Sequence, residues 1–154
     1  MTRRTILPLA TIALVLLLAA VALSACGGSS TPSDVSTALK DNSQVSQYAD
    51  AFAAAGISGN GPFTVVAATD DALTKAGVKL TSDAVKASVI DGTNVTKADA
   101  TKGAKWDSML ANNSIYSYTG TDGQLYVNSF KVVGDPITTG NGTIYVVDGV
   151  IQPK

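Results

Sequence analysis

The chain has 154 residues, with 11 Lys and Arg against 12 acidic residues, and it contains no His and a single Cys. Without His the usual general base near neutral pH is missing, zinc or copper sites built on His or Cys cannot form, and one Cys excludes a disulfide within the chain. The near-neutral charge argues against nucleic acid as a partner, so we expect no metal, no cofactor and no enzymatic activity.

The first 25 residues are laid out like a secretory signal, with a basic start at Arg3-Arg4 and an apolar run over Ile6–Leu23. The run ends in Leu23-Ser24-Ala25-Cys26, which resembles the bacterial lipobox. We therefore expect residues 1–25 to be a lipoprotein signal peptide that is cut between Ala25 and Cys26, with Cys26 lipidated. An uncleaved membrane helix is the alternative, because a run of about 18 apolar residues can span a bilayer.

The predicted anchor determines where the chain works. Each acyl methylene buried in the bilayer contributes roughly 0.8 kcal/mol, so two or three acyl chains would hold the protein durably. Residues 26–33 are then the lipidated Cys and a flexible Gly/Ser-rich tether. The expected location is the cell membrane or the outer membrane, facing the periplasm or the cell exterior. Arg3-Arg4 also resembles a twin-arginine export signal, although the Leu-rich run favours the general secretory route.

Residues 34–154 begin with two predicted helices, Asp34–Lys40 and Asn42–Ala55. Asn42 or Ser43 can cap the second helix. Its apolar side chains recur at i, i+3, i+4 and i+7, which predicts one buried stripe. The stripe consists of Val45, Tyr48, Ala49 and Phe52.

A turn at 59–62 precedes a predicted strand over Phe63–Ala67, and Thr69-Asp70-Asp71 then opens a short helix that Gly77 ends. The next helix begins at Thr81 or Ser82 and leads into a strand at Val89-Ile90. A loop is expected around Asp91 to Asp99 and again around Trp106.

The last third is predicted to be β-rich. Strands are expected over Ser114–Thr119 and Gln124–Asn128, joined by a hairpin turn at 121–123, and then over Lys131–Val133 and Ile144–Val147. Helices followed by strands predict an α+β domain.

Two segments resemble the fasciclin (FAS1) domain family. Residues 61–73, GPFTVVAATDDAL, resemble the family pattern G-P-F-T-V-F-A-P-T-[ND]-x-A-F. Residues 141–153, NGTIYVVDGVIQP, resemble N-G-x-I-H-V-I-D-x-V-L-x-P. The resemblance covers residues 34–154 and implies a wedge of about seven β-strands with several packed α-helices.

The family motifs receive structural interpretations. Thr69 and Asp70 lie where a buried strand runs into a capped helix. Asn141 and Gly142 form a turn before the last buried strand, and Asp148 is expected to accept backbone N–H groups at the turn that follows it. The chain departs from the family at the Tyr-His pair linked with integrin recognition in some animal members, where it has Ala87-Ser88. That role is therefore not carried over.

The remaining chemistry favours binding over catalysis. Asp70-Asp71 is the only adjacent acidic pair, and neighbouring helix positions point apart. Asp91, Asn94 and Asp99 could contact Ca²⁺, although solvated turn residues are the simpler interpretation. The candidate binding residues are aromatic: Trp106, Tyr116, Tyr118 and Tyr126. Trp106 could instead cover the edge of the core, and the tyrosines could form a cross-strand ladder that binds nothing.

The resulting hypothesis is a membrane-anchored extracytoplasmic lipoprotein that acts as an adhesion or interaction module on an unknown protein or glycan. The word adhesion comes from the family resemblance alone. The alternative is a small-ligand or glycan-binding lipoprotein, which a concave pocket lined by aromatic side chains would favour.

Overall fold

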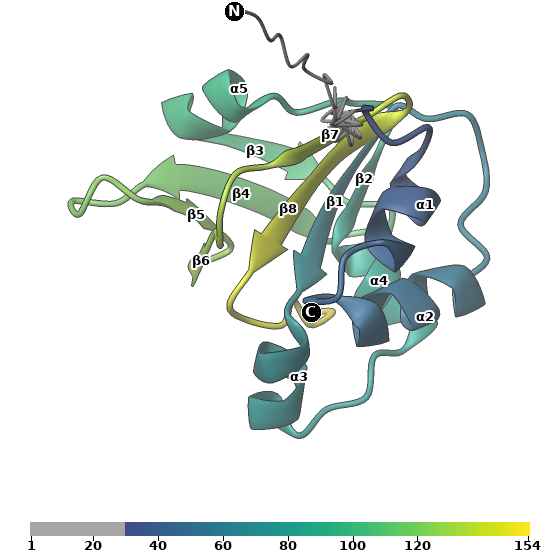
Figure 1. Cartoon of the computed structure of the whole chain (residues 1–154). Helices are drawn as coiled ribbons and strands as arrows, with labels where there is room; N and C mark the ends of the chain where they lie inside the picture. The colour runs from purple at the N-terminus through teal and green to yellow at the C-terminus, as the bar shows by residue number, and fades with distance from the viewer. Residues whose placement is uncertain (1–29) are drawn as a thin grey trace, which may run out of the picture.

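The computed structural model describes residues 30–154, shown in colour in Figure 1. Those residues form five helices and eight strands, and the strands make two four-stranded sheets with the orders β2-β1-β8-β7 and β3-β4-β5-β6. The α+β class is confirmed, with one strand more than the family resemblance suggested. The elements are α1 (Val35–Lys40), α2 (Ser46–Ala54), β1 (Phe63–Ala68), α3 (Asp70–Ala76), α4 (Ser82–Ala87), β2 (Val89–Asp91), α5 (Lys97–Lys102), β3 (Ala104–Asp107), β4 (Ser114–Thr119), β5 (Leu125–Val127), β6 (Phe130–Lys131), β7 (Ile137–Thr139) and β8 (Gly142–Val147).

The first sheet is centred on β1 and β8, which run parallel from the pair Phe63–Gly142 to the pair Ala68–Val147. Every residue of both strands is buried, because α1, α2 and α4 cover one face and the second sheet covers the other. Successive residues therefore enter different core clusters. Val65 packs with the helices, whereas Val66 packs with Ile115 of β4.

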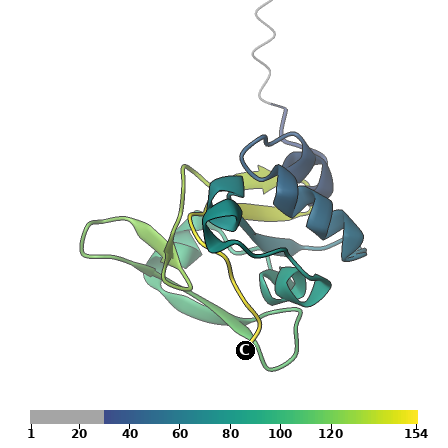
Figure 2. The ribbon, with the colours of Figure 1, turned by 90° about the horizontal axis from the view of Figure 1, so that it is seen from below.

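The second sheet has one buried face and one exposed face. On β4, Ile115 and Ser117 are buried while Tyr116 and Tyr118 point outward. Figure 2 shows this sheet and its long hairpin on the opposite side of the first sheet from α1 and α2. The two sheets meet where Val132 bridges to Val147. The strand predicted over Lys131–Val133 is therefore shorter, and it continues as this isolated bridge.

The helix predicted over Asn42–Ala55 begins later, at Ser46. Asn42 does not cap it, because its side chain accepts the N–H of Gln44 in a turn. The residue before the helix is Val45, which has no side-chain cap to offer. The predicted stripe is confirmed, because Val45, Tyr48, Ala49 and Phe52 are all buried.

The loop predicted from Asp91 to Asp99 is confirmed only over residues 92–96, because Asp91 belongs to β2 and Asp99 to α5, and the loop predicted around Trp106 is wrong. Thr96 caps α5 by accepting the N–H of Asp99, and Gly103, with a φ of 77°, ends the helix. Trp106 lies within β3. The other three residues of β3 are exposed, so the strand has no alternating apolar pattern to reveal it.

Candidate functional site

Three tyrosines form a row on the outer face of the second sheet. Tyr116 and Tyr118 lie two residues apart on β4, and Tyr126 on β5 is directly opposite Tyr118. The ring centroids of Tyr116 and Tyr118 are 6.4 Å apart with 14° between the planes, and those of Tyr118 and Tyr126 are 5.3 Å apart with 9° between the planes. The predicted cross-strand ladder is confirmed, and we call it the tyrosine row.

Hydrogen bonds hold the two outer members of the row. The hydroxyl groups of Tyr116 and Ser129 are 2.9 Å apart, and the Tyr126 hydroxyl donates to Asp122 Oδ2 over 2.9 Å. The bond to the Asp122 carboxylate raises the pKa of Tyr126. The pKa of Asp122 is lowered, first by the backbone N–H of Gln124 and then by Tyr126.

The central tyrosine has a different role from its neighbours. Tyr118 is 39% exposed and stacks between the two held rings. Among the described residues no side chain or backbone group bonds to its hydroxyl. The row therefore presents a ring that is already ordered, with a hydroxyl ready to donate or accept. Such a ring loses little conformational entropy when a partner binds.

Two lysines flank the row. Lys105 of β3 is opposite Tyr116, and Lys131 of β6 is opposite Tyr126. Both are exposed. Their side chains share the outer face with the rings, because cross-strand partners point to the same side of a sheet.

Trp106 does not belong to this surface, although the sequence grouped it with the tyrosines. It is opposite Ile115, so its side chain lies on the inner face of the sheet, where it is half-buried against the second core cluster. Successive residues of a strand point to opposite faces, and Trp106 follows the outward-facing Lys105. The structure thus brings together three of the four candidate binding residues.

The motif residues Thr69 and Asp70 stabilise two different helices. Thr69 caps α3, as predicted, by accepting the N–H of Ala72 over 3.1 Å. Asp70 lies in α3, but its carboxylate accepts the N–H groups of Ser46 and Gln47 at the start of α2. Its Oδ2 also accepts the Ser46 hydroxyl over 2.5 Å. Asp70 thus supplies the cap that Val45 cannot.

Asp148 also bonds farther away than predicted. Its Oδ1 accepts the backbone N–H of Lys131 over 2.8 Å. The donor comes from β6, 17 residues away in sequence, and not from the turn at Asp148 itself. The side chain therefore ties the end of β8 to the second sheet.

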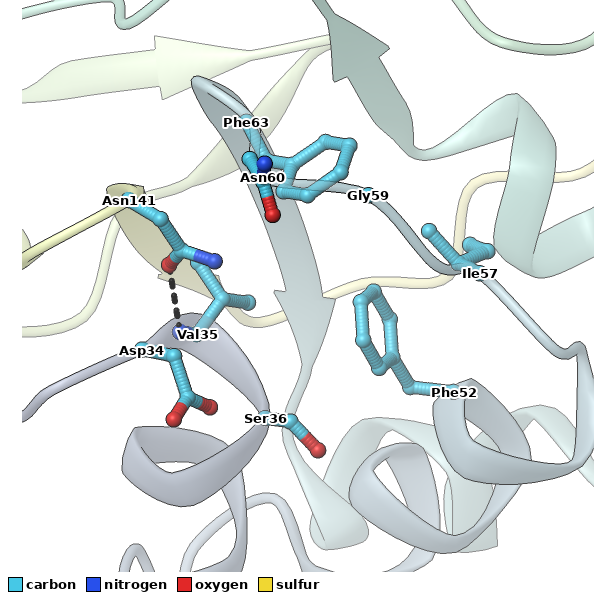
Figure 3. A pocket seen from close by; sticks show the side chains of 9 residues that line it. All are labelled: Asp34, Val35, Ser36, Phe52, Ile57, Gly59, Asn60, Phe63 and Asn141. Carbon is cyan, nitrogen blue, oxygen red and sulfur yellow. Dashed lines mark hydrogen bonds between the residues drawn. The ribbon is translucent and has the colours of Figure 1, made fainter.

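Asn141 and Gly142 lie at the start of β8. Asn141 Oδ1 accepts the N–H of Val35 over 2.8 Å, the bond drawn in Figure 3. Gly142 approaches β1 so closely that an added Cβ would lie 2.2 Å from the backbone oxygen of Phe63. Asn141 thus joins α1 to the last strand, and the close β1–β8 contact requires glycine at 142.

A hollow of about 370 Å³ opens beside Asn141. Figure 3 shows the rings of Phe52 and Phe63 and the side chain of Ile57 on one side, with Asp34 and Asn141 on the other. A second, more open hollow of about 550 Å³ lies at the tip of the β4–β5 hairpin. Tyr118, Tyr126 and residues 119–122 line it. The hollow at the hairpin tip lies beside the tyrosines, where the alternative hypothesis expected a pocket, whereas the sequence did not predict the hollow beside Asn141.

Residues 30–154 were searched for metal sites and for helices that could span a membrane. No three His, Cys, Asp or Glu side chains gather there as a metal site would require, and no helix in that range is long and apolar enough to cross a membrane. Two of the three residues considered for Ca²⁺ have other partners, since the side chain of Asn94 accepts from Thr143 and that of Asp99 accepts from Thr96. Ala25 and Cys26 lie outside the described residues.

Comparison with known proteins identifies what the chain resembles. The family profile of the Fasciclin domain matches residues 33–153. No curated protein sequence matches. Seventeen solved chains match in structure, among them a FAS1 domain pair from the insect cell adhesion molecule Fasciclin I, with 13% sequence identity and a TM-score of 0.64. That match covers 79% of this chain and 52% of the other, so this chain spans about half the length of that structure. At this identity the likeness concerns the fold.

Proposed function

The chain belongs to the fasciclin domain family, and from this premise we propose that it is a non-enzymatic contact module held on the outer side of a bacterial membrane by lipid on Cys26. The tyrosine row carries the proposal for the contact itself. Two of its rings are exposed and Tyr126 is half-buried, hydrogen bonds hold the outer rings, and Lys105 and Lys131 flank the row. Tyrosine is among the side chains that contribute most of the binding energy at protein interfaces, and lysines at the rim of such a surface add charge that can steer a partner.

The proposed anchor rests on the sequence. Leu23-Ser24-Ala25-Cys26 follows an apolar run, and Cys26 is the chain's only Cys. Replacing Cys26 by Ser in the full chain should prevent both the acylation and the cut, so the variant should keep the unacylated mass of residues 1–154. A wild-type protein of unacylated mass would overturn the anchor.

The proposal of contact without catalysis rests on composition. The chain offers no imidazole to move a proton near neutral pH. Of the two adjacent carboxylates, that of Asp70 already accepts the N–H groups of Ser46 and Gln47 at the start of α2.

The proposed contact can be tested with residues 27–154 and native cell envelope. Tyr118→Ala should reduce the amount of envelope-bound protein at least tenfold, because a central anchoring side chain contributes about 2 kcal/mol or more. Val78→Ala is the matched control, since Val78 is also 39% exposed but lies between α3 and α4, outside the tyrosine row. Equal loss in both variants, or none in Tyr118→Ala, would contradict the proposal.

A glycan is a second candidate partner, favoured by the hollow at the hairpin tip. Tyr118 and Tyr126 line it together with Asp122, Thr119 and Thr121. Aromatic side chains beside a carboxylate and hydroxyl groups suit a sugar ring. Gly120 lies so close to Tyr126 that an added Cβ would be 2.7 Å from the ring.

This candidate is distinguished from a protein partner by competition. Neutral oligosaccharides prepared from the envelope should displace residues 27–154 if the partner is a glycan. Thr121→Ala should weaken that displacement, while Thr93→Ala, an exposed threonine in the loop after β2 and far from the tyrosine row, should not. Displacement by protease treatment of the envelope and not by oligosaccharide would identify a protein partner.

A further inference from the structure

The last residues of the predicted tether are held against the folded domain. The carbonyl oxygen of Pro32 accepts the N–H of Gly140 over 3.0 Å. Ser33 packs so tightly on the same turn that a Cβ added to Gly140 would lie 2.5 Å from the Ser33 carbonyl oxygen. Two residues later, the N–H of Val35 donates to Asn141 Oδ1. We call these contacts the root clamp.

We propose that the root clamp fixes which end of the domain faces the membrane, and that this end lies against the headgroup layer of the bilayer that holds the anchor. The inference rests on the proposed lipidation of Cys26. Its partner is the phospholipid surface itself.

The linker between Cys26 and Pro32 is short compared with the domain. Pro32 is six positions after Cys26 in the sequence, and a fully extended chain spans at most about 3.5 Å per residue, or about 20 Å. A domain of about 120 residues has a radius of gyration of about 14 Å, which corresponds to a diameter of about 35 Å. The linker is therefore too short to pass around the domain, so the opposite end cannot turn toward the bilayer.

The root clamp lies at one end of the domain. Figure 1 shows the first described residues beside the end of β7 and the start of β8, while α3 and the loop after it lie at the other end of the molecule. The end that faces the bilayer therefore includes Asp34, Asn60 and Asn141, which border the hollow in Figure 3. We call this end the root face.

The chemistry of the root face indicates how it meets lipid. Ser36, Asn60 and Asn141 supply hydroxyl and amide groups that can bond to phosphate and ester oxygens. Asp34 is the one charged residue among those that line the hollow, and no Lys is among them. The contact should therefore not depend on anionic lipid, which attracts basic segments.

The experiment uses the full acylated chain on phosphatidylcholine vesicles that carry a headgroup-level quencher. A fluorophore is placed at Asn60→Cys on the root face or at Lys79→Cys in the loop between α3 and α4. Quenching at position 60 should exceed quenching at 79 severalfold, and adding anionic lipid should not change the ratio. Equal quenching at the two positions would overturn the inference.

Two further variants test the cause. Inserting about 20 Gly and Ser residues between Ser29 and Ser30 leaves the domain untouched and should abolish the difference in quenching. Gly140→Ala should break the clamp and expose residues 30–34 to protease. Gly134→Ala should not, because its φ of +73° makes the substitution strain the backbone there while an added Cβ meets nothing within 4 Å. A difference in quenching that survives the insertion would also overturn the inference.

Failure of the anchor gives a separate result. Wild-type protein that carries no acyl chain and stays out of the vesicle fraction would overturn the proposed lipidation and this inference together. Vesicle-bound protein with equal quenching overturns the orientation alone.

Discussion

At the scale of single residues, the polar side chains of the family motifs connect separate elements. The Asp70 carboxylate belongs to α3 and caps α2, and the Asp148 carboxylate at the end of β8 accepts from β6. Asn141 accepts from the start of α1. Each bond satisfies a backbone N–H that would otherwise have no partner in its own element.

Replacing Asp70 by Ala should lower the free energy of unfolding by about 1 to 2 kcal/mol, because the first N–H groups of α2 lose their acceptor. Urea denaturation of residues 27–154 measures the change. Asp71→Ala is the matched control, since Asp71 is the exposed neighbour in the same helix turn and should change stability by less than about 0.5 kcal/mol. Equal effects of the two substitutions would contradict the assignment of the cap.

Alkaline pH should destabilise the fold through Tyr145. Burial raises its pKa to about 12, and its hydroxyl donates to the carbonyl oxygen of Val95 over 2.9 Å. In the unfolded chain this phenol loses its proton near pH 10, so the contribution of Tyr145 to stability is complete below pH 10 and is lost as the pH rises through 12. Burial also raises the pKa of Tyr48, so ionisation of Tyr48 at alkaline pH should destabilise the fold as well.

The free energy of unfolding should therefore fall between pH 10 and pH 12, by on the order of 2 kcal/mol for Tyr145. Tyr145→Phe should be less stable than wild type at pH 8 and should show a smaller fall above pH 10. Urea denaturation at pH 8, 10 and 11 provides the comparison. Parallel pH curves for the two proteins would show that Tyr145 does not cause the fall.

At the scale of elements, two glycines mark where strands and turns approach most closely. A Cβ added to Gly142 would lie 2.2 Å from the backbone oxygen of Phe63, at the start of the β1–β8 pair. A Cβ added to Gly149 would lie 1.9 Å from a ring carbon of Phe130. The first neighbour is backbone and cannot move, whereas the second is a side chain.

We therefore expect the two glycine substitutions to respond differently when the neighbouring phenylalanine is also replaced. Gly149→Ala should cost about 1 to 3 kcal/mol alone and much less in a Phe130→Ala background, because the ring that it meets is gone. Gly142→Ala should cost at least as much, and Phe63→Ala should not relieve it. Denaturant unfolding of the four variants and the two double variants measures both couplings. Relief in both pairs, or in neither, would contradict this distinction.

The sequence predicted some elements well because each had a strong pattern. The stripe of α2 and the buried runs of β1 and β8 are continuous signals, and Thr69 and Gly77 mark the ends of α3 as expected. β3 was missed because exposed residues surround Trp106, and α5 was missed because Ala100 is its only buried residue. The late start of α2 depends on Asp70, 24 residues away from Ser46, which no local pattern could indicate.

The candidate site was predicted only where a local sequence pattern placed its residues. Alternation on β4 places Tyr116 and Tyr118 on one face, and the hairpin brings Tyr126 opposite Tyr118. The partners Ser129 and Asp122, which hold the outer rings, depend on the exact pairing of the hairpin. Trp106 could not be placed without the register of β3, because a shift of one residue reverses the face.

At the scale of the whole molecule, the two sheets and the root clamp give the domain a direction. The second sheet lies to one side of the first, opposite α1 and α2, as Figures 1 and 2 show. If the root face lies on the bilayer, the outer face of that sheet is directed sideways along the membrane. The tyrosine row would then meet partners that stand beside the protein in the envelope.

The central claim is that the tyrosine row is the surface through which this fasciclin domain makes its contacts. The most direct test places a photoreactive amino acid at position 118 or at position 78 of the full chain in native envelope. We predict covalent adducts at 118 that fall when unlabelled residues 27–154 are added, and none above background at 78. Adducts of equal yield at both positions, or at 78 alone, would contradict the claim.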